Sequence, residues 1–137
     1  MSPRESYSNR MQCQLQGIRA VTQASDAARA FGEAQQLADD DCARLCIVIE
    51  ELVANLYEHG ELTDQHKVEL TLSREPGYIR TIIADPGRPF DPRSATPKGE
   101  RPERGGGVGI EIIRSWAQFV DYTVNLEGNR LELVLPI

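Results

Sequence analysis

Long apolar runs and an excess of basic residues are both missing from this sequence, and these absences argue against two classes of protein. No stretch approaches the roughly 18 apolar residues of a membrane span, and the N-terminus MSPRESYSNR lacks the apolar segment of a signal peptide. The net charge of −6 argues against a general nucleic-acid binder, because contacts to phosphate groups need a basic surface. We expect a cytoplasmic protein that contacts neither membrane nor nucleic acid.

Cysteine is also scarce, and the three cysteines are odd in number: Cys13, Cys42 and Cys46. Cys42 and Cys46 are spaced i, i+4 on a predicted helix, a spacing that can serve a metal ion. No other Cys or His lies near them in sequence to complete a tetrahedral set of ligands. We therefore interpret Cys42 and Cys46 as buried reduced thiols, which indicates a reducing cytoplasm.

Nothing in the sequence indicates more than one domain. The 137 residues are enough to bury one substantial core, and no internal repeat or low-complexity tract is found. Residues 1–10 are polar and aperiodic, so we expect a flexible N-terminus followed by a single domain over residues 11–137.

The segment Ile47–Gly60, IVIEELVANLYEHG, is predicted to lie in a helix that carries both core and functional residues. At about 3.6 residues per turn, its apolar stripe consists of Leu45, Ile49, Leu52 and Leu56. Glu51, Asn55 and His59 follow at i, i+4 and i+8 along one flank of the stripe. Polar groups at the edge of a core need partners, so this line suggests the wall of a pocket. The other interpretation is an amphipathic helix whose polar residues border solvent, as Glu50 on the opposite side is expected to do.

The chain before this helix is expected to form a strand and then another helix. Residues 11–20 alternate in polarity, and three of them are expected to face inward: Cys13, Leu15 and Ile18. Ser25 and Asp26 are predicted to cap the N-terminus of the alanine-rich helix that follows. The core-facing stripe of that helix is expected to be Ala27, Ala30, Phe31, Ala34 and Leu37.

The boundaries of the central helix and the strands after it are also marked. The acidic triplet Asp39–Asp41 suits the N-terminus of the central helix, where the helix dipole favours negative charge, and Gly60 suits its C-cap. Residues 67–85 are predicted to form an antiparallel hairpin that ends at Asp85. Two further strands about a turn at Glu127–Asn129 are predicted to close the chain.

Residues 86–107 hold five of the chain's eight prolines, and this density of proline and glycine excludes a helix or a central strand. A structureless loop of about twenty residues is uncommon within a domain and is usually functional or mobile. The loop is basic within an acidic protein, which suggests a small anionic ligand; a solvated flexible loop explains the composition equally well. A helix is predicted over residues 108–120, and glycines 105, 106, 107 and 109 at its entry offer backbone N–H groups for an anion.

Three segments stand in a fixed order along the chain: EELVANLYEH, ADPGRPFDP and GGGVGIEIIRSW. Together they resemble the N, G1 and G2 boxes of the GHKL ATP-binding fold. The sequence PFDP that follows Asp-x-Gly resembles the same region of one short, single-domain branch of this fold. That branch contains the anti-sigma-factor serine/threonine kinases of bacterial partner-switching systems. The resemblance covers residues 12–137. It implies an α/β (α+β) two-layer sandwich of the Bergerat type, with a mostly antiparallel sheet covered on one face by about three helices.

The resemblance implies a role for each matching residue. Asn55 would coordinate a Mg²⁺ ion that bridges the nucleotide phosphates, and Glu51 would be the general base for the attacking hydroxyl. Asp85 would accept a hydrogen bond from the adenine amino group, and Gly87 would let the backbone approach the base. Residues 92–107 would be the ATP lid. The other cofactor contacts would be Phe90, Arg104, Gly105, Gly106, Gly107, Val108 and Gly109.

Some roles stay open between alternatives. His59 either contacts the nucleotide or packs at the helix end, and Phe90 lies under the lid or the adenine, or in the core. Arg101 and Arg104 contact either a terminal phosphate or a partner protein. Pro86 between the aspartate and the glycine is less usual for the family and is expected to stiffen the adenine loop.

The implied function is that of a cytoplasmic serine/threonine protein kinase and anti-sigma factor. It would bind ATP and Mg²⁺, phosphorylate a STAS-type anti-anti-sigma protein, sequester a sigma factor and form a homodimer. The chain carries neither the phosphoacceptor helix pair of a sensor histidine kinase nor a transducer domain, so we expect neither of those protein types. One alternative is a non-catalytic ATP-binding module that regulates a partner by binding alone. A third is an ATPase without a protein substrate.

Overall fold

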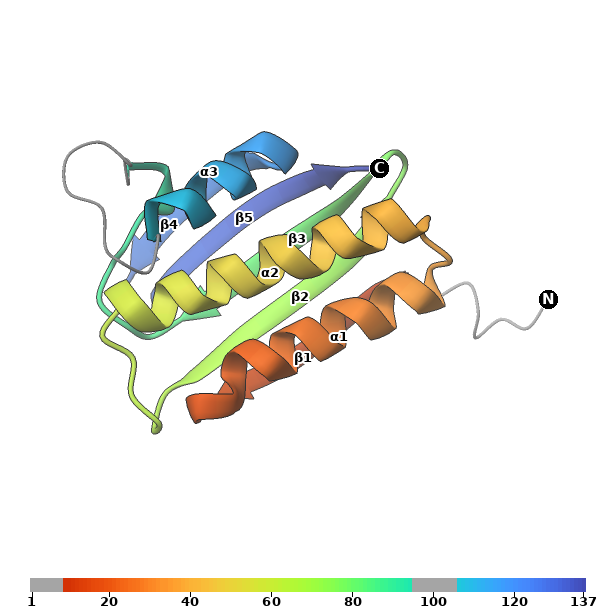
Figure 1. Ribbon diagram of the computed structural model, residues 1–137. Helices are drawn as coiled ribbons and strands as arrows, with labels where there is room; N and C mark the ends of the chain where they lie inside the picture. Colours follow the sequence, from red (N-terminus) through yellow and green to blue (C-terminus); the bar gives the residue numbers. More distant parts are fainter. Residues whose placement is uncertain (1–8, 95–105) are drawn as a thin grey trace.

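The computed structural model describes residues 9–94 and 106–137 (Figure 1). The strands in this part of the chain are β1 Arg10–Gln16, β2 Lys67–Glu75, β3 Tyr78–Asp85, β4 Gln118–Asn125 and β5 Gly128–Pro136. The α-helices are α1 Ala20–Ala34, α2 Asp39–His59 and α3 Gly106–Trp116. There are also two short 3-10 helices. The first, η2 Gly17–Arg19, follows β1, and the second, η3 Pro92–Ser94, is the last element before residues 95–105.

The strands form one sheet in the order β1-β2-β3-β5-β4, in which every neighbouring pair is antiparallel. Helices α1, α2 and α3 all lie on one face of this sheet (Figure 1). The predicted two-layer α+β sandwich is therefore confirmed. Within the described residues, no helix is long and apolar enough to cross a membrane.

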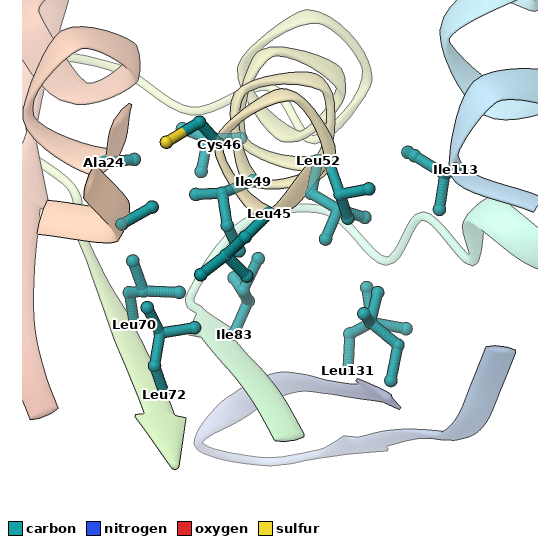
Figure 2. Packing of buried hydrophobic residues seen from close by; sticks show 14 of the residues in the cluster. Ala24, Leu45, Cys46, Ile49, Leu52, Leu70, Leu72, Ile83, Ile113 and Leu131 are labelled. Carbon is teal, nitrogen blue, oxygen red and sulfur yellow. The ribbon is translucent and has the colours of Figure 1, made fainter. Parts of the chain in front are cut away.

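The core lies between the two layers because the helices present apolar residues about every 3.6 residues and the strands present them at every second residue, each toward the other layer. The predicted stripe of α2 is buried throughout: Leu45, Ile49, Leu52 and Leu56. Figure 2 shows this face of α2 above strand residues that include Leu70, Leu72, Ile83 and Leu131. Each fully buried leucine or isoleucine contributes about 1.5–3 kcal/mol to folding, so this packing fixes the position of α2 above the sheet.

The first strand is shorter than predicted. Leu15 is buried and Cys13 half-buried, but β1 ends at Gln16 and Ile18 is 95% exposed rather than inward-facing. The cause is a turn at Gly17, whose φ of +75° is a conformation that residues with a side chain rarely adopt. The chain leaves the sheet at this turn and enters α1.

Helix α1 begins at Ala20, so the prediction that Ser25 and Asp26 cap it is wrong. Ser25 is buried inside the helix, and its Oγ donates a hydrogen bond of 2.6 Å to Oε2 of Glu50 on α2. A serine tolerates a mid-helix position when its hydroxyl has such a partner. The prediction that Glu50 is an ordinary solvated charge is also wrong, because its side chain is half-buried in this contact.

The buried stripe of α1 is rotated relative to the prediction. Phe31 is buried as predicted, Ala27 and Leu37 are half-buried, and Ala30 and Ala34 are exposed. The buried residues are Ala20, Ala24, Ser25, Ala28, Phe31 and Gly32. Alanine-rich sequence has weak contrast between its faces, so periodicity alone placed the stripe incorrectly.

The limits of α2 and both hairpins follow the sequence patterns closely. The acidic triplet occupies the first turn of α2, and the N–H of Gly60 at its C-cap donates to the carbonyl oxygen of Leu56 at 2.7 Å. Helix α3 is shorter than predicted, because residues 118–125 pair with β5 as strand β4. Ile110 and Ile113 of α3 are buried in the core.

Candidate functional site

Asp85 closes β3 and is buried at the end of the sheet, with 6% of its surface exposed. Its Oδ1 accepts the backbone N–H of Gly87 at 2.8 Å and the side-chain amide of Asn129 at 3.1 Å. Burial raises the pKa of Asp85, and these two hydrogen bonds act against that rise. Because both bonds end on Oδ1, Oδ2 is left to accept an N–H from a ligand.

Asn129 is a residue of this region that the sequence patterns did not reveal. It is 3% exposed, and its Nδ2 donates to the carbonyl oxygen of Gly87 at 2.9 Å as well as to Asp85. One amide therefore holds both the carboxyl group and the loop that follows it. The available signal was its phase on β5, because it lies on the same face of the strand as the inward-facing residues Leu131, Leu133 and Leu135. A polar residue at such a position requires a partner.

The loop after β3 packs directly on the end of α2. A Cβ on Gly87 would lie 2.5 Å from the carbonyl oxygen of Gly60 and 2.7 Å from Cδ2 of Leu62, so only glycine fits. The same carbonyl oxygen accepts the N–H of Arg88 at 2.7 Å. These contacts bring Asp85 beside the helix that carries Glu51 and Asn55.

Asn55 lies on the predicted flank of α2 and is buried, with 6% of its surface exposed. Its Nδ2 donates to the backbone carbonyl oxygen of Glu51 at 2.7 Å. This bond holds the side chain along the helix and leaves the amide oxygen as an acceptor or metal ligand. Within the described residues, no group of three or more His, Cys, Asp or Glu side chains is arranged for a metal ion. Any metal here would therefore depend on few protein ligands.

The carboxyl group of Glu51 packs against the first turns of α3. A Cβ added to Gly109 would lie 2.3 Å from Oε2 of Glu51 and 3.0 Å from its Cδ, so the glycine makes room for this carboxyl group. The predicted base and the predicted glycine-rich helix entry, more than fifty residues apart in sequence, thus meet in the fold.

His59 and Phe90 form a stacked pair at the C-terminal end of α2, with ring centroids 4.6 Å apart and an interplanar angle of 22°. The backbone N–H of Phe90 donates to the hydroxyl oxygen of Tyr122 on β4 at 2.8 Å. Burial raises the pKa of Tyr122, so its hydroxyl group remains protonated. One face of the Phe90 ring is covered by His59, which ties the segment just before the predicted lid to α2.

The predicted lid, residues 92–107, lies mostly outside the described residues, as do Arg101, Arg104 and Gly105. Gly106, Gly107 and Val108 form the first turn of α3, and Gly109 follows them. The first N–H groups of an α-helix have no partner within the helix, and the dipole there favours negative charge. This end of the region is therefore suited to an anionic group.

The described residues thus build two chemically different ends around the C-terminal half of α2. Asp85 and Asn129 offer a buried hydrogen-bond acceptor at one end. Glu51, Asn55 and the N-terminus of α3 meet at the other. The arrangement suits a ligand with an N–H donor at one end and a phosphate-like anion at the other.

A comparison with protein-family models matches residues 17–135 to the histidine kinase-like ATPase domain. The chain belongs to this family. A search of curated proteins finds no match. The match to the family spans nearly the whole fold, from the turn after β1 to the end of β5.

Solved structures of histidine kinases share the fold. The histidine kinase domain of the blue-light activated histidine kinase from Erythrobacter litoralis EL346 is 14% identical, with a TM-score of 0.54. That match covers 85% of this chain but only 59% of the other. The catalytic domain of histidine kinase ThkA, in a nucleotide-free form, is also 14% identical, with a TM-score of 0.51. It covers 92% of this chain and 97% of the other. At this identity the likeness shows the fold, and the anti-sigma branch of the family stays a prediction.

Proposed function

We propose that this member of the histidine kinase-like ATPase family is a serine/threonine protein kinase that transfers the γ-phosphoryl group of Mg²⁺-bound ATP to a STAS-type protein. The observation that carries the proposal is the contact of the Glu51 carboxyl group with Gly109 at the entry of α3, one helical turn from Asn55. Under this proposal, a base, a metal ligand and a phosphate-binding helix end would stand at one place. Phosphoryl transfer needs little more, because the protein mainly positions groups and stabilises charge.

The adenine base would bind at Asp85. The free Oδ2 would accept the adenine amino group, while Asn129 and the Gly87 N–H hold Oδ1 in place. Binding of an N–H donor compensates the burial of this carboxyl group, whose pKa is raised. Adenine is thereby preferred over a base that presents a carbonyl oxygen at the same position, since two acceptors would face each other.

The phosphates would lie between Asn55 and the first turn of α3. Asn55 fits a Mg²⁺ ion because its Nδ2 is committed to the Glu51 carbonyl oxygen and its oxygen atom, a hard ligand, is left for the metal. Mg²⁺ usually takes one or two protein ligands and completes its shell with water and phosphate oxygens. The ion would supply charge neutralisation for the phosphates.

Glu51 would accept the proton of the attacking hydroxyl group. Its side chain is half-buried, so part of it remains accessible from solvent. Packing against Gly109 restricts the carboxyl group to the phosphate end of the site. A positioned general base contributes roughly 10²–10⁴-fold to a rate.

The partner and setting of the proposal rest on the resemblance to anti-sigma-factor kinases. The chain would act in the cytoplasm as a homodimer, sequester a sigma factor, and release it when the STAS-type antagonist is unphosphorylated. The test incubates the chain with γ-labelled ATP and a purified STAS-type protein. Label on a serine or threonine of the STAS protein supports the proposal. Binding of ATP without transfer of label would instead indicate a non-catalytic module that acts by sequestration. Release of phosphate in the absence of the STAS protein would indicate an ATPase without a protein substrate.

A further inference from the structure

A groove of about 470 Å³ runs between α1 and α2 on the side of the helices that faces away from the sheet. The groove forms beside a point where the two helices approach closely, because the residues next to that point are small. A Cβ on Gly32 of α1 would lie only 2.5 Å from Sγ of Cys42 on α2, so the glycine leaves room for this thiol at the crossing. Ala43, which is exposed, leaves the adjacent space open.

The floor of the groove is apolar. Leu37 and Cys42 are half-buried, Cys46 is buried, and Ile47 exposes 36% of its surface at the lip. Figure 2 shows Cys46 pointing from α2 toward Ala24 of α1. Burial raises the pKa of Cys46 to about 11, so its thiol is neutral at physiological pH and behaves as a small apolar group.

The rim of the groove is acidic. Glu33 and Asp39 are exposed, and Glu50 is half-buried beneath them in its hydrogen bond with Ser25. Against these three carboxyl groups stands one basic side chain, Arg29, which forms an ion pair of 3.3 Å with Asp26 outside the groove. The groove therefore combines an apolar floor with uncompensated negative charge.

The groove is separate from the nucleotide site although both border α2. Glu50 contacts Ser25 of α1, whereas the next residue, Glu51, contacts Gly109 of α3. Successive residues on a helix differ by about 100° in direction, so α2 forms a ridge with the groove on one side and the proposed catalytic carboxyl group on the other.

We propose that this groove binds a partner protein through a basic amphipathic helix of that partner. The apolar side chains of the partner's helix would pack on Leu37, Cys46 and Ile47. The lysine or arginine side chains of that helix would face Glu33 and Asp39. Helices that dock in a groove between two helices are recognised by such a pattern of apolar anchors, and charges of opposite sign guide the approach and set the orientation. This surface goes beyond the kinase reaction and does not depend on nucleotide.

The test uses two synthetic peptides and two matched variants of the full chain. One peptide carries leucine on one face of a helix and lysine on the other; the second has glutamate in place of lysine. Ala43→Arg fills the groove and adds positive charge, whereas Ala30→Arg makes the same change at an exposed helical alanine outside it. Arginine is a good helix former, so both variants should fold.

Binding is measured by fluorescence anisotropy of the labelled peptides, without nucleotide. The lysine peptide should bind the wild type and Ala30→Arg equally and bind Ala43→Arg at least about tenfold more weakly. The glutamate peptide should not bind. Glu33→Lys should weaken binding of the lysine peptide more than Glu127→Lys, which makes the same charge change on an exposed residue in the β4–β5 turn. Equal binding by Ala43→Arg and Ala30→Arg, or equal losses for the two lysine variants, would overturn the assignment.

Discussion

Nδ2 of Asn129 lies 3.1 Å from Oδ1 of Asp85, and both side chains are buried at the same end of the sheet. β3 and β5 pair in register at these two residues, which places the amide opposite the carboxyl group. The same Nδ2 reaches the carbonyl oxygen of Gly87, so one side chain orients the acceptor and the loop beside it. The proposed adenine contact therefore depends on a residue from the last strand of the chain.

Asn129→Ala should weaken ATP binding about tenfold, because a hydrogen bond to a charged group contributes roughly 1.5–3 kcal/mol and its loss frees Asp85 to change orientation. Isothermal titration calorimetry measures the effect. Asn125→Ala is the control, since Asn125 is exposed at the end of β4, where its side-chain oxygen accepts the N–H of Glu127. Equal losses of affinity in the two variants would remove Asn129 from the site.

Asp85→Asn should make the protein more stable at neutral pH while abolishing ATP binding. The pKa of Asp85 is raised in the folded state above its ordinary value of 3.8, so the folded state binds this proton more tightly than the unfolded state. Stability from this group is thus lost as the pH rises from 3.8 through the raised pKa. The extra stability of the asparagine variant relative to the wild type should therefore shrink as the pH falls toward 3.8. Melting temperatures measured across this range check the trend, and a constant difference would contradict it.

Asn55→Ala should weaken binding of ATP in the presence of Mg²⁺ and leave binding in the presence of a chelator nearly unchanged. The reason is that the variant removes the amide oxygen proposed to hold the ion, while Asp85 at the adenine end is untouched. Calorimetry with and without Mg²⁺ gives both affinities. If the Mg²⁺-dependent part of the affinity survives, the ion is held elsewhere.

Gly109→Ala should slow phosphoryl transfer by roughly 10²-fold, the scale of a displaced general base. The added methyl group overlaps the carboxyl end of Glu51, which is flexible and can move away, so the melting temperature should change little. In a Glu51→Gln background the same change should cause little further loss, because the two residues act as a unit. Additive losses in the double variant would show that the glycine acts independently of Glu51.

The sequence predicted those features that depend on strong local patterns. Helix α2, with its apolar stripe and polar flank, and the end of β3 at Asp85 follow from periodicity and from glycine and proline positions. The rotation of α1 could not be predicted, because alanine lies on both its faces and the deciding contact is Ser25 with Glu50 of another helix. The Phe90–His59 stack likewise depends on packing between distant segments.

Asn129 shows a different limit of sequence analysis. Its turn-like neighbours, Glu127 and Gly128, suggested a loop residue, whereas strand β5 begins at Gly128 and points Asn129 inward. The inward phase was visible in the sequence, but its partner, Asp85, was not. Only the register between β3 and β5 joins the two residues.

The most direct test of the proposed kinase compares Glu51→Gln with Glu50→Gln in the transfer of γ-labelled phosphate to the STAS-type protein. The two neighbouring carboxyl groups contact different helices, Glu50 contacting α1 and Glu51 contacting α3, and a glutamine at position 50 can still accept the Ser25 hydroxyl. We predict that Glu51→Gln keeps its affinity for ATP and loses roughly 10²-fold or more in transfer rate, while Glu50→Gln remains close to wild type. A Glu51→Gln variant as active as the wild type, or a wild type that binds ATP and transfers nothing, would contradict the proposal.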